Sequence, residues 1–145
     1  MEYVINFELF FAKIARWLKR SGLLFVQTLN HRHTTFEEPP ELEGVLDGSR
    51  YLSSVHLLHF QQDLALRDRW WYSGTHAGRT NEAWMVNFMA NEDTIRKLLV
   101  KRHGIESASL RFRRTLWRFA FKSELFCYDN GNFVGVAHLL FQKTH

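Results

Sequence analysis

The segment from Asn6 to Leu29 constrains the fold most, because it has the pattern of a helix, a tight break and a buried strand. Its first half predicts an amphipathic helix with one buried apolar stripe, since apolar side chains recur there at helical spacing. The stripe consists of Phe7, Phe10, Phe11, Ile14, Trp17 and Leu18. Asn6 suits the N-cap of this helix, and Gly22 suits its C-terminal end.

The strand expected after Gly22 spans Leu23 to Leu29 and is almost entirely apolar, with no alternation. Such a strand is typical of the interior of a parallel sheet, because helices cover both of its faces there. A helix that leads through a glycine into this kind of strand forms half of a doubly wound α/β layer. Since the chain opens with that half, we expect the preceding half of the layer to be missing from it.

Length and composition favour a single, partial domain over residues 1–145, large enough to bury a core. The only cysteine, Cys127, excludes an internal disulfide and is compatible with a reducing compartment. No apolar run reaches the roughly 18 to 20 residues of a membrane span, and the N-terminus lacks the features of a signal peptide. We therefore expect a cytoplasmic protein without a membrane span.

Loops and strands divide the rest of the chain. Residues 30–50 are polar and contain two prolines, which predicts a long loop, and residues 52–60 suit a short helix or turn. A second strand is expected from Leu64 to Tyr72. A last strand is expected from Phe133 to Phe141, after a strong turn signal at residues 129–132.

Two helices are expected between these strands. The first is one long helix capped by Thr80 and ended by Gly104, with a buried face formed by Trp84, Phe88, Ile95, Leu98 and Leu99. The second begins at a Ser107 cap and runs to about Phe126. Its surface is apolar nearly all round, so we expect this helix to be buried.

Five strings occur in one order along the chain, at Asn6–Leu9, Leu57–Asp63, Gly74–His76, Arg79–Trp84 and Glu124–Gly131. Together they resemble the coclaurine N-methyltransferase and cyclopropane-fatty-acid synthase family, whose members use S-adenosylmethionine. The resemblance is closer to the plant-type N-methyltransferases than to the lipid-modifying branch. It implies an α/β fold, namely the C-terminal half of a doubly wound, Rossmann-like methyltransferase sheet with a helical substrate-side cap.

The resemblance also indicates which parts of the family's site are absent or altered. The family binds S-adenosylmethionine with a glycine-rich turn and an acidic residue that both lie upstream of Met1, so we expect this chain to bind no cofactor. The family's catalytic Glu-His pair falls on Glu2 and Tyr3, of which only the glutamate matches. A histidine and a tyrosine that contribute to a bicarbonate site in the lipid branch are replaced here by Gln27 and Ala77.

Methyl transfer to an amine requires a base and a site for cations. Glu2 is the candidate base in a complete protein. The end of a chain is poorly ordered, however, so we favour the interpretation of Glu2 as a frayed terminal residue. Ring faces attract both the cofactor sulfonium and a protonated amine. The resulting substrate-pocket candidates are Phe60, His76, Trp117, Phe121 and Glu124. Trp84 and Phe126 suit ordinary core packing instead.

Glu124 is informative because a carboxylate on an otherwise apolar helix needs a partner. That partner is either an arginine such as Arg118 or a cationic substrate, and the sequence leaves the two possibilities open.

Histidine spacing permits a metal hypothesis, since His31 and His33, and likewise His56 and His59, can share a face. A zinc site needs three or four convergent ligands. No such motif is present in the sequence, so we interpret these residues as surface or pocket-rim histidines and expect no metal.

A basic run spans the end of one predicted helix and the start of the next. It could attract nucleic acid or an anionic membrane surface. We interpret it as a solvated junction between helices and expect no nucleic-acid partner. The run consists of Lys97, Lys101, Arg102, His103, Arg111, Arg113, Arg114 and Arg118.

The sequence therefore predicts the C-terminal portion of an S-adenosylmethionine-dependent methyltransferase. We expect N-methylation of a small amine as the ancestral reaction and no activity from the isolated chain. One alternative is a non-enzymatic binding or interaction protein descended from the fold, and another is lipid modification by a cyclopropane-fatty-acyl-phospholipid synthase-like parent. An unpaired sheet edge would favour self-association.

Overall fold

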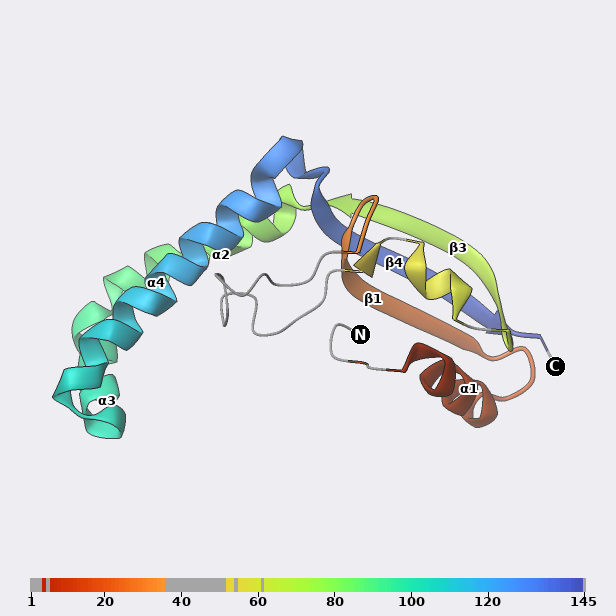
Figure 1. Ribbon diagram of the computed structural model, residues 1–145, viewed down its shortest axis with the longest axis horizontal. Coiled ribbons are helices and arrows are strands. Elements are labelled where there is room, and N and C mark those ends of the chain that lie inside the picture. Colours follow the sequence, from red (N-terminus) through yellow and green to blue (C-terminus); the bar gives the residue numbers. More distant parts are fainter. Residues whose placement is uncertain (1–3, 5, 36–51, 54, 61, 145) are drawn as a thin grey trace.

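The computed structural model describes residues 4, 6–35, 52–53, 55–60 and 62–144. A four-stranded sheet with one helix packed against it forms the body of the molecule, and a helical arm extends from one end of the sheet (Figure 1). The strand order is β2-β1-β4-β3. These strands are β1 (Leu23–His31), β2 (Leu52–Ser53), β3 (Leu64–Ser73) and β4 (Val134–Lys143).

Helix α1 (Phe7–Trp17) begins as predicted, because the backbone N–H of Leu9 donates to Asn6 Oδ1 at 2.9 Å. Its apolar stripe packs on the sheet, where the ring of Phe11 lies 5.6 Å from that of Phe141. Trp17 is exposed rather than buried, since it lies roughly 120° around the helix from Phe11. The prediction that Gly22 ends the helix is also wrong, because Leu18 already has extended backbone angles.

Strand β1 corrects the prediction of an interior parallel strand. It pairs antiparallel with β4 along its whole length, and its parallel pairing with β2 is limited to Asn30 and His31. Val26 faces α1 and is buried, whereas Leu23 and Phe25 are exposed on the opposite face. The strand is apolar on both sides, but the described residues cover the side opposite α1 only near Leu29.

Strands β3 and β4 confirm the two predicted later strands within two residues at each end. The turn before β4 is also confirmed. It is the short helix η3 (Tyr128–Gly131), in which Asp129 and Asn130 take positive φ angles of 50° and 54°. Residues 52–60 contain a short helix as expected, η2 (His56–His59), but β2 precedes it. Most of the predicted 30–50 loop lies outside the described residues, and Asn30 and His31 belong to β1.

The arm consists of α2 (Thr75–Ala90), α3 (Glu92–His103) and α4 (Ile105–Cys127). The prediction of one long helix starting at Thr80 is therefore wrong, both about where the helix begins and about its continuity. The Thr80 hydroxyl lies inside α2 and donates to the carbonyl of His76 at 2.9 Å instead of capping the helix. Asn91 interrupts the helix with non-helical angles. Gly104 ends α3 as predicted, with φ at 81°, and α4 begins directly after it, ahead of Ser107.

Helix α4 is only half covered, which corrects the expectation that it is buried. One face packs against α2, where the rings of Phe88 and Phe112 stack at 4.7 Å. Its other face leaves Leu110 and Trp117 exposed. Trp84 and Leu98, both expected on buried faces, are exposed as well, whereas Phe126 is buried as predicted. The arm is too thin to cover every apolar side chain on its helices.

A tight junction fixes the arm to the sheet. The N–H of Gly74 donates to the carbonyl of Gly131 at 2.9 Å, and the Ser73 hydroxyl donates to the carbonyl of Asn130 at 3.0 Å. A Cβ at Gly74 would lie only 2.0 Å from the carbonyl oxygen of Val134. The chain therefore passes from β3 into α2 through a site that accommodates no side chain.

Candidate functional site

The candidate site lies where the arm meets the face of the sheet opposite α1, which we term the outer face. A small apolar cluster forms this corner around Phe126 and Val134. Phe121 from α4, Ala77 from α2 and Leu29 from β1 all pack against it. The fold thus gathers a predicted pocket residue, Phe121, and the altered family position Ala77 at one corner.

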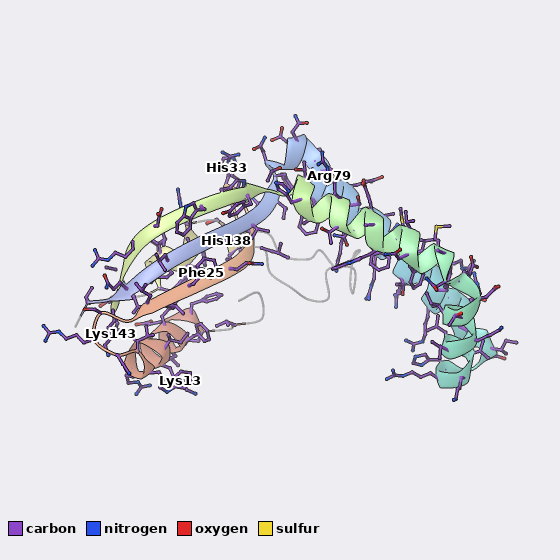
Figure 2. All side chains as sticks on the ribbon, turned by 180° about the vertical axis from the view of Figure 1, so that it is seen from behind. Lys13, Phe25, His33, Arg79, His138 and Lys143 are labelled. Atoms are coloured by element: carbon purple, nitrogen blue, oxygen red, sulfur yellow. The ribbon has the colours of Figure 1, made fainter. Side chains whose placement is uncertain are left out.

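A polar pair lies further along the outer face. Gln27 stands opposite His138 in the β1–β4 register, so their side chains share a face. Gln27 Oε1 lies 3.1 Å from His138 Nε2. The ring centroid of His138 is 5.0 Å from that of Phe25 and 4.6 Å from that of Tyr72. Figure 2 shows Phe25 and His138 on the sheet.

This arrangement can bind a polar or cationic group. In the tautomer in which His138 Nε2 donates to Gln27, Nδ1 is left as a basic nitrogen. The surrounding Phe25 and Tyr72 rings present aromatic surface of the kind that attracts cations. Sequence reasoning did not single out His138. Only the strand register, which places it opposite Gln27, could have identified it.

Three of the predicted pocket residues lie together on α4. The ring centroids of Trp117 and Phe121 are 5.8 Å apart, and Glu124 follows on the next turn. Trp117 is 48% exposed, and Glu124 is exposed too. Water therefore solvates the Glu124 carboxylate, which removes the need for a partner that the sequence suggested. The three side chains form an open aromatic and acidic surface.

The other predicted site residues lie elsewhere or outside the described residues. Phe60 packs under α1, with its ring 5.8 Å from that of Phe7 and 4.8 Å from that of His56. His76 is exposed in the first turn of α2, near the junction. Glu2 and Tyr3 are not among the described residues. The predicted pocket is thus divided, with Phe60 in the core of the sheet and Trp117, Phe121 and Glu124 on the arm.

His31 is buried, which corrects its interpretation as a surface or rim histidine. Its Nδ1 accepts from the backbone N–H groups of His33 and Thr34, at 3.2 and 3.0 Å. Burial, and secondarily the proximity of His33, lowers its pKa below the ordinary value of 6.5. Within the described part of the chain, no group of three or more side chains is placed to hold a metal ion.

No helix in the described ranges combines the length and the apolar character needed to cross a membrane.

The same arrangement of sheet and arm occurs in a crystal structure of coclaurine N-methyltransferase bound to N-methylheliamine and S-adenosylhomocysteine. The match has a TM-score of 0.86 at 30% identity and covers 98% of this chain and 45% of that one. A cyclopropane synthase from Mycobacterium tuberculosis shares the fold with a TM-score of 0.68 at 14% identity, over 95% of this chain and 50% of that one. This chain therefore has the fold of the C-terminal part of an S-adenosylmethionine-dependent methyltransferase, which confirms the predicted fold class.

Sequence comparison gives similar relatives. The (S)-coclaurine N-methyltransferase of Papaver somniferum is 31% identical over 153 aligned positions, which cover 99% of this chain and 43% of that protein. The chain is thus similar over nearly its whole length to part of the coclaurine N-methyltransferases, the relatives that its motifs predicted. It spans less than half the length of the curated relatives that it matches. No protein-family model matches it.

Proposed function

We propose that this chain forms the substrate-side part of an N-methyltransferase that acts on a small amine. The observation that carries the proposal is the surface of Trp117, Phe121 and Glu124, within a fold that matches an enzyme bound to N-methylheliamine. Aromatic faces attract a protonated amine, and a nearby carboxylate complements its charge. The lipid-modifying alternative rests only on a fold likeness at 14% identity.

In this proposal Trp117 and Phe121 hold the amine, and Glu124 orients its positive charge. Glu2 removes the amine proton as the nitrogen becomes a nucleophile. His76 is a candidate for the rim near the junction, whereas Phe60 packs against Phe7 on the α1 side of the sheet and does not line this surface.

The described residues do not fit the cofactor. Gly74 and Gly78 are the glycines of the segment that opens α2, and packing occupies the space beside both. A Cβ at Gly74 would meet the Val134 carbonyl, and one at Gly78 would meet Cys127 Sγ at 2.3 Å. These glycines serve close packing rather than a phosphate or ribose cradle, so we expect the isolated chain to bind no S-adenosylmethionine and to have no activity.

Calorimetric titration of the purified chain tests both parts. We expect N-methylheliamine to bind and S-adenosylhomocysteine to give no binding heat. Trp117→Ala should weaken amine binding by about fivefold or more, since a cation–π contact contributes about 1 kcal/mol or more. Trp17→Ala, which removes an exposed tryptophan from α1, serves as the matched control.

Two results would contradict the proposal separately. Micromolar affinity for S-adenosylhomocysteine would show that a cofactor site exists in this chain. Amine affinity that is unchanged in Trp117→Ala, or absent from the wild-type chain, would remove the α4 surface as the substrate site.

A further inference from the structure

The outermost part of the arm carries more positive charge than the molecule as a whole. We define the arm tip as residues 92–118, which comprise α3 and the first half of α4 and lie at the end of the arm away from the sheet (Figure 1). The segment contains eight Lys or Arg residues against three Asp or Glu residues, a net charge of +5, whereas the whole chain is +4. The remainder of the chain is therefore slightly negative.

Most of these cations are exposed and free of carboxylate partners among the described residues. Arg96 is the exception, since its Nε lies 2.6 Å from Glu92 Oε1 and its guanidinium lies 4.1 Å from the centre of the Phe112 ring. Arg118 is only partly exposed and has an interaction of its own. The exposed set consists of Lys97, Lys101, Arg102, Arg111, Arg113 and Arg114.

His103 lies among these cations. Partial burial lowers the pKa of His103, and the nearby guanidinium groups of Arg111 and Arg102 lower it further. Like charges concentrated at one end of a molecule create a potential that attracts an extended anionic surface.

Large aliphatic side chains are exposed among the same cations. Ile105 is 77% exposed, and Leu98 and Leu110 are each 60% exposed. Helix α3 buries none of its twelve residues. On α3, Lys101 and Arg102 lie one turn from Leu98, so the charged and the aliphatic side chains share one side of the helix.

We propose that the arm tip docks on the surface of an anionic lipid bilayer. Lys and Arg side chains are attracted to anionic headgroups. Exposed aliphatic side chains lower the free energy of the bound state when they enter the boundary between headgroups and acyl chains. A single-stranded nucleic acid would be held by exposed rings on which bases stack. Residues 92–111 contain no Phe, Trp or Tyr, and Phe112 is buried. The exposed ring of Trp117 lies at the end of the tip nearest the sheet, beyond these cations and aliphatic side chains. This inference is independent of the proposed methyltransferase role.

Co-sedimentation of the full chain with vesicles tests the proposal. We expect binding to mixed phosphatidylcholine–phosphatidylserine vesicles, weak binding to phosphatidylcholine alone, and release by high salt. The double variant Lys101→Gln/Arg102→Gln should lower the partition coefficient by about tenfold or more, since each basic residue near the surface contributes about 1 kcal/mol. Lys19→Gln/Arg20→Gln, which removes two exposed charges near the end of α1, is the charge-matched control and should bind as wild type.

A second pair of variants tests the aliphatic contribution. Leu98→Ser/Ile105→Ser changes only exposed residues, so the fold should survive, and vesicle binding should fall severalfold at constant charge. Binding that is equal for both lipid mixtures, or equal for the tip and control variants, would overturn the proposal. The proposal would also be overturned if the wild-type chain bound no vesicles and Leu98→Ser/Ile105→Ser still bound a single-stranded RNA. That result would assign the tip to nucleic acid.

Discussion

At the scale of single residues, His31 makes the stability of this chain dependent on pH. Its Nδ1 must stay unprotonated to accept from the N–H groups of His33 and Thr34. Because its pKa is lowered in the folded state, the unfolded chain binds more protons as the pH falls below about 6.5. The stabilisation is fully present above that pH and is lost as the pH falls through the folded-state pKa. We expect the free energy of unfolding, measured by urea denaturation, to decrease between pH 7 and pH 5.

An asparagine at this position separates titration from hydrogen bonding. In His31→Asn the amide oxygen can accept the same two N–H groups and does not titrate, so the dependence on pH should become shallower while stability at pH 7 changes by about 1 kcal/mol or less. His31→Phe removes the acceptor and should cost about 1 to 3 kcal/mol at pH 7. An unchanged pH profile in His31→Asn would show that His31 is not the titrating group.

Residue types allowed some local predictions and not others. Asn6 as the N-cap and Asp129–Asn130 as a turn were predictable, because short polar side chains favour those backbone geometries wherever they occur. The burial of His31 and the pairing of Gln27 with His138 were not predictable, since both depend on contacts between β1 and β4, more than 100 positions apart in the chain.

At the scale of elements, the junction between β3 and α2 determines how the arm is held. Gly74→Ala would place a methyl group within 2.4 Å of two backbone oxygens, those of Val134 and Phe126. The backbone must move to relieve this overlap, so we expect a loss of about 2 to 4 kcal/mol in the free energy of unfolding. Ser73→Ala removes the hydroxyl that donates to the Asn130 carbonyl and accepts from the Thr75 N–H at the same junction, and should cost only about 1 to 2 kcal/mol.

Thermal and urea melts of the two variants would provide the comparison. If Gly74→Ala costs no more than Ser73→Ala, the close approach at Gly74 does not limit the position of the arm.

Element boundaries in the arm show where helical patterns mislead. The pattern from Thr80 to Gly104 is compatible with one helix, and Asn91 alone is a weak signal for a break. In the structure Asn91 leaves helical geometry, and its side chain donates to the carbonyl of Asn87 at 2.8 Å. Local competition of this kind for backbone groups explains why asparagine interrupts helices, but the sequence does not show which asparagine will do so.

At the scale of the whole molecule, the apolar pattern of β1 predicts a strand correctly, but it does not predict the antiparallel pairing with β4 or the exposed outer side. The strand is apolar on both sides. Among the described residues α1 covers one side, whereas on the other side Leu29 packs against the arm and Leu23 and Phe25 stay exposed. Periodicity predicts that a strand prefers burial but does not show which element supplies it.

The open outer face leads us to expect that the chain self-associates in solution. Leu23, Phe25, Trp70 and Tyr72 are exposed on it, and β1 lacks a described partner on its second edge from Leu23 to Leu29. Burying such side chains against a second copy contributes about 1.5 to 3 kcal/mol each, and an unpaired edge provides backbone hydrogen bonds.

Phe25→Glu, at a position 54% exposed, should raise the dissociation constant of self-association at least about tenfold in sedimentation velocity. Trp17→Glu adds the same charge to the exposed side of α1 and should leave association unchanged. A wild-type chain that stays monomeric at high micromolar concentration would contradict the expectation and show that another element covers the outer face.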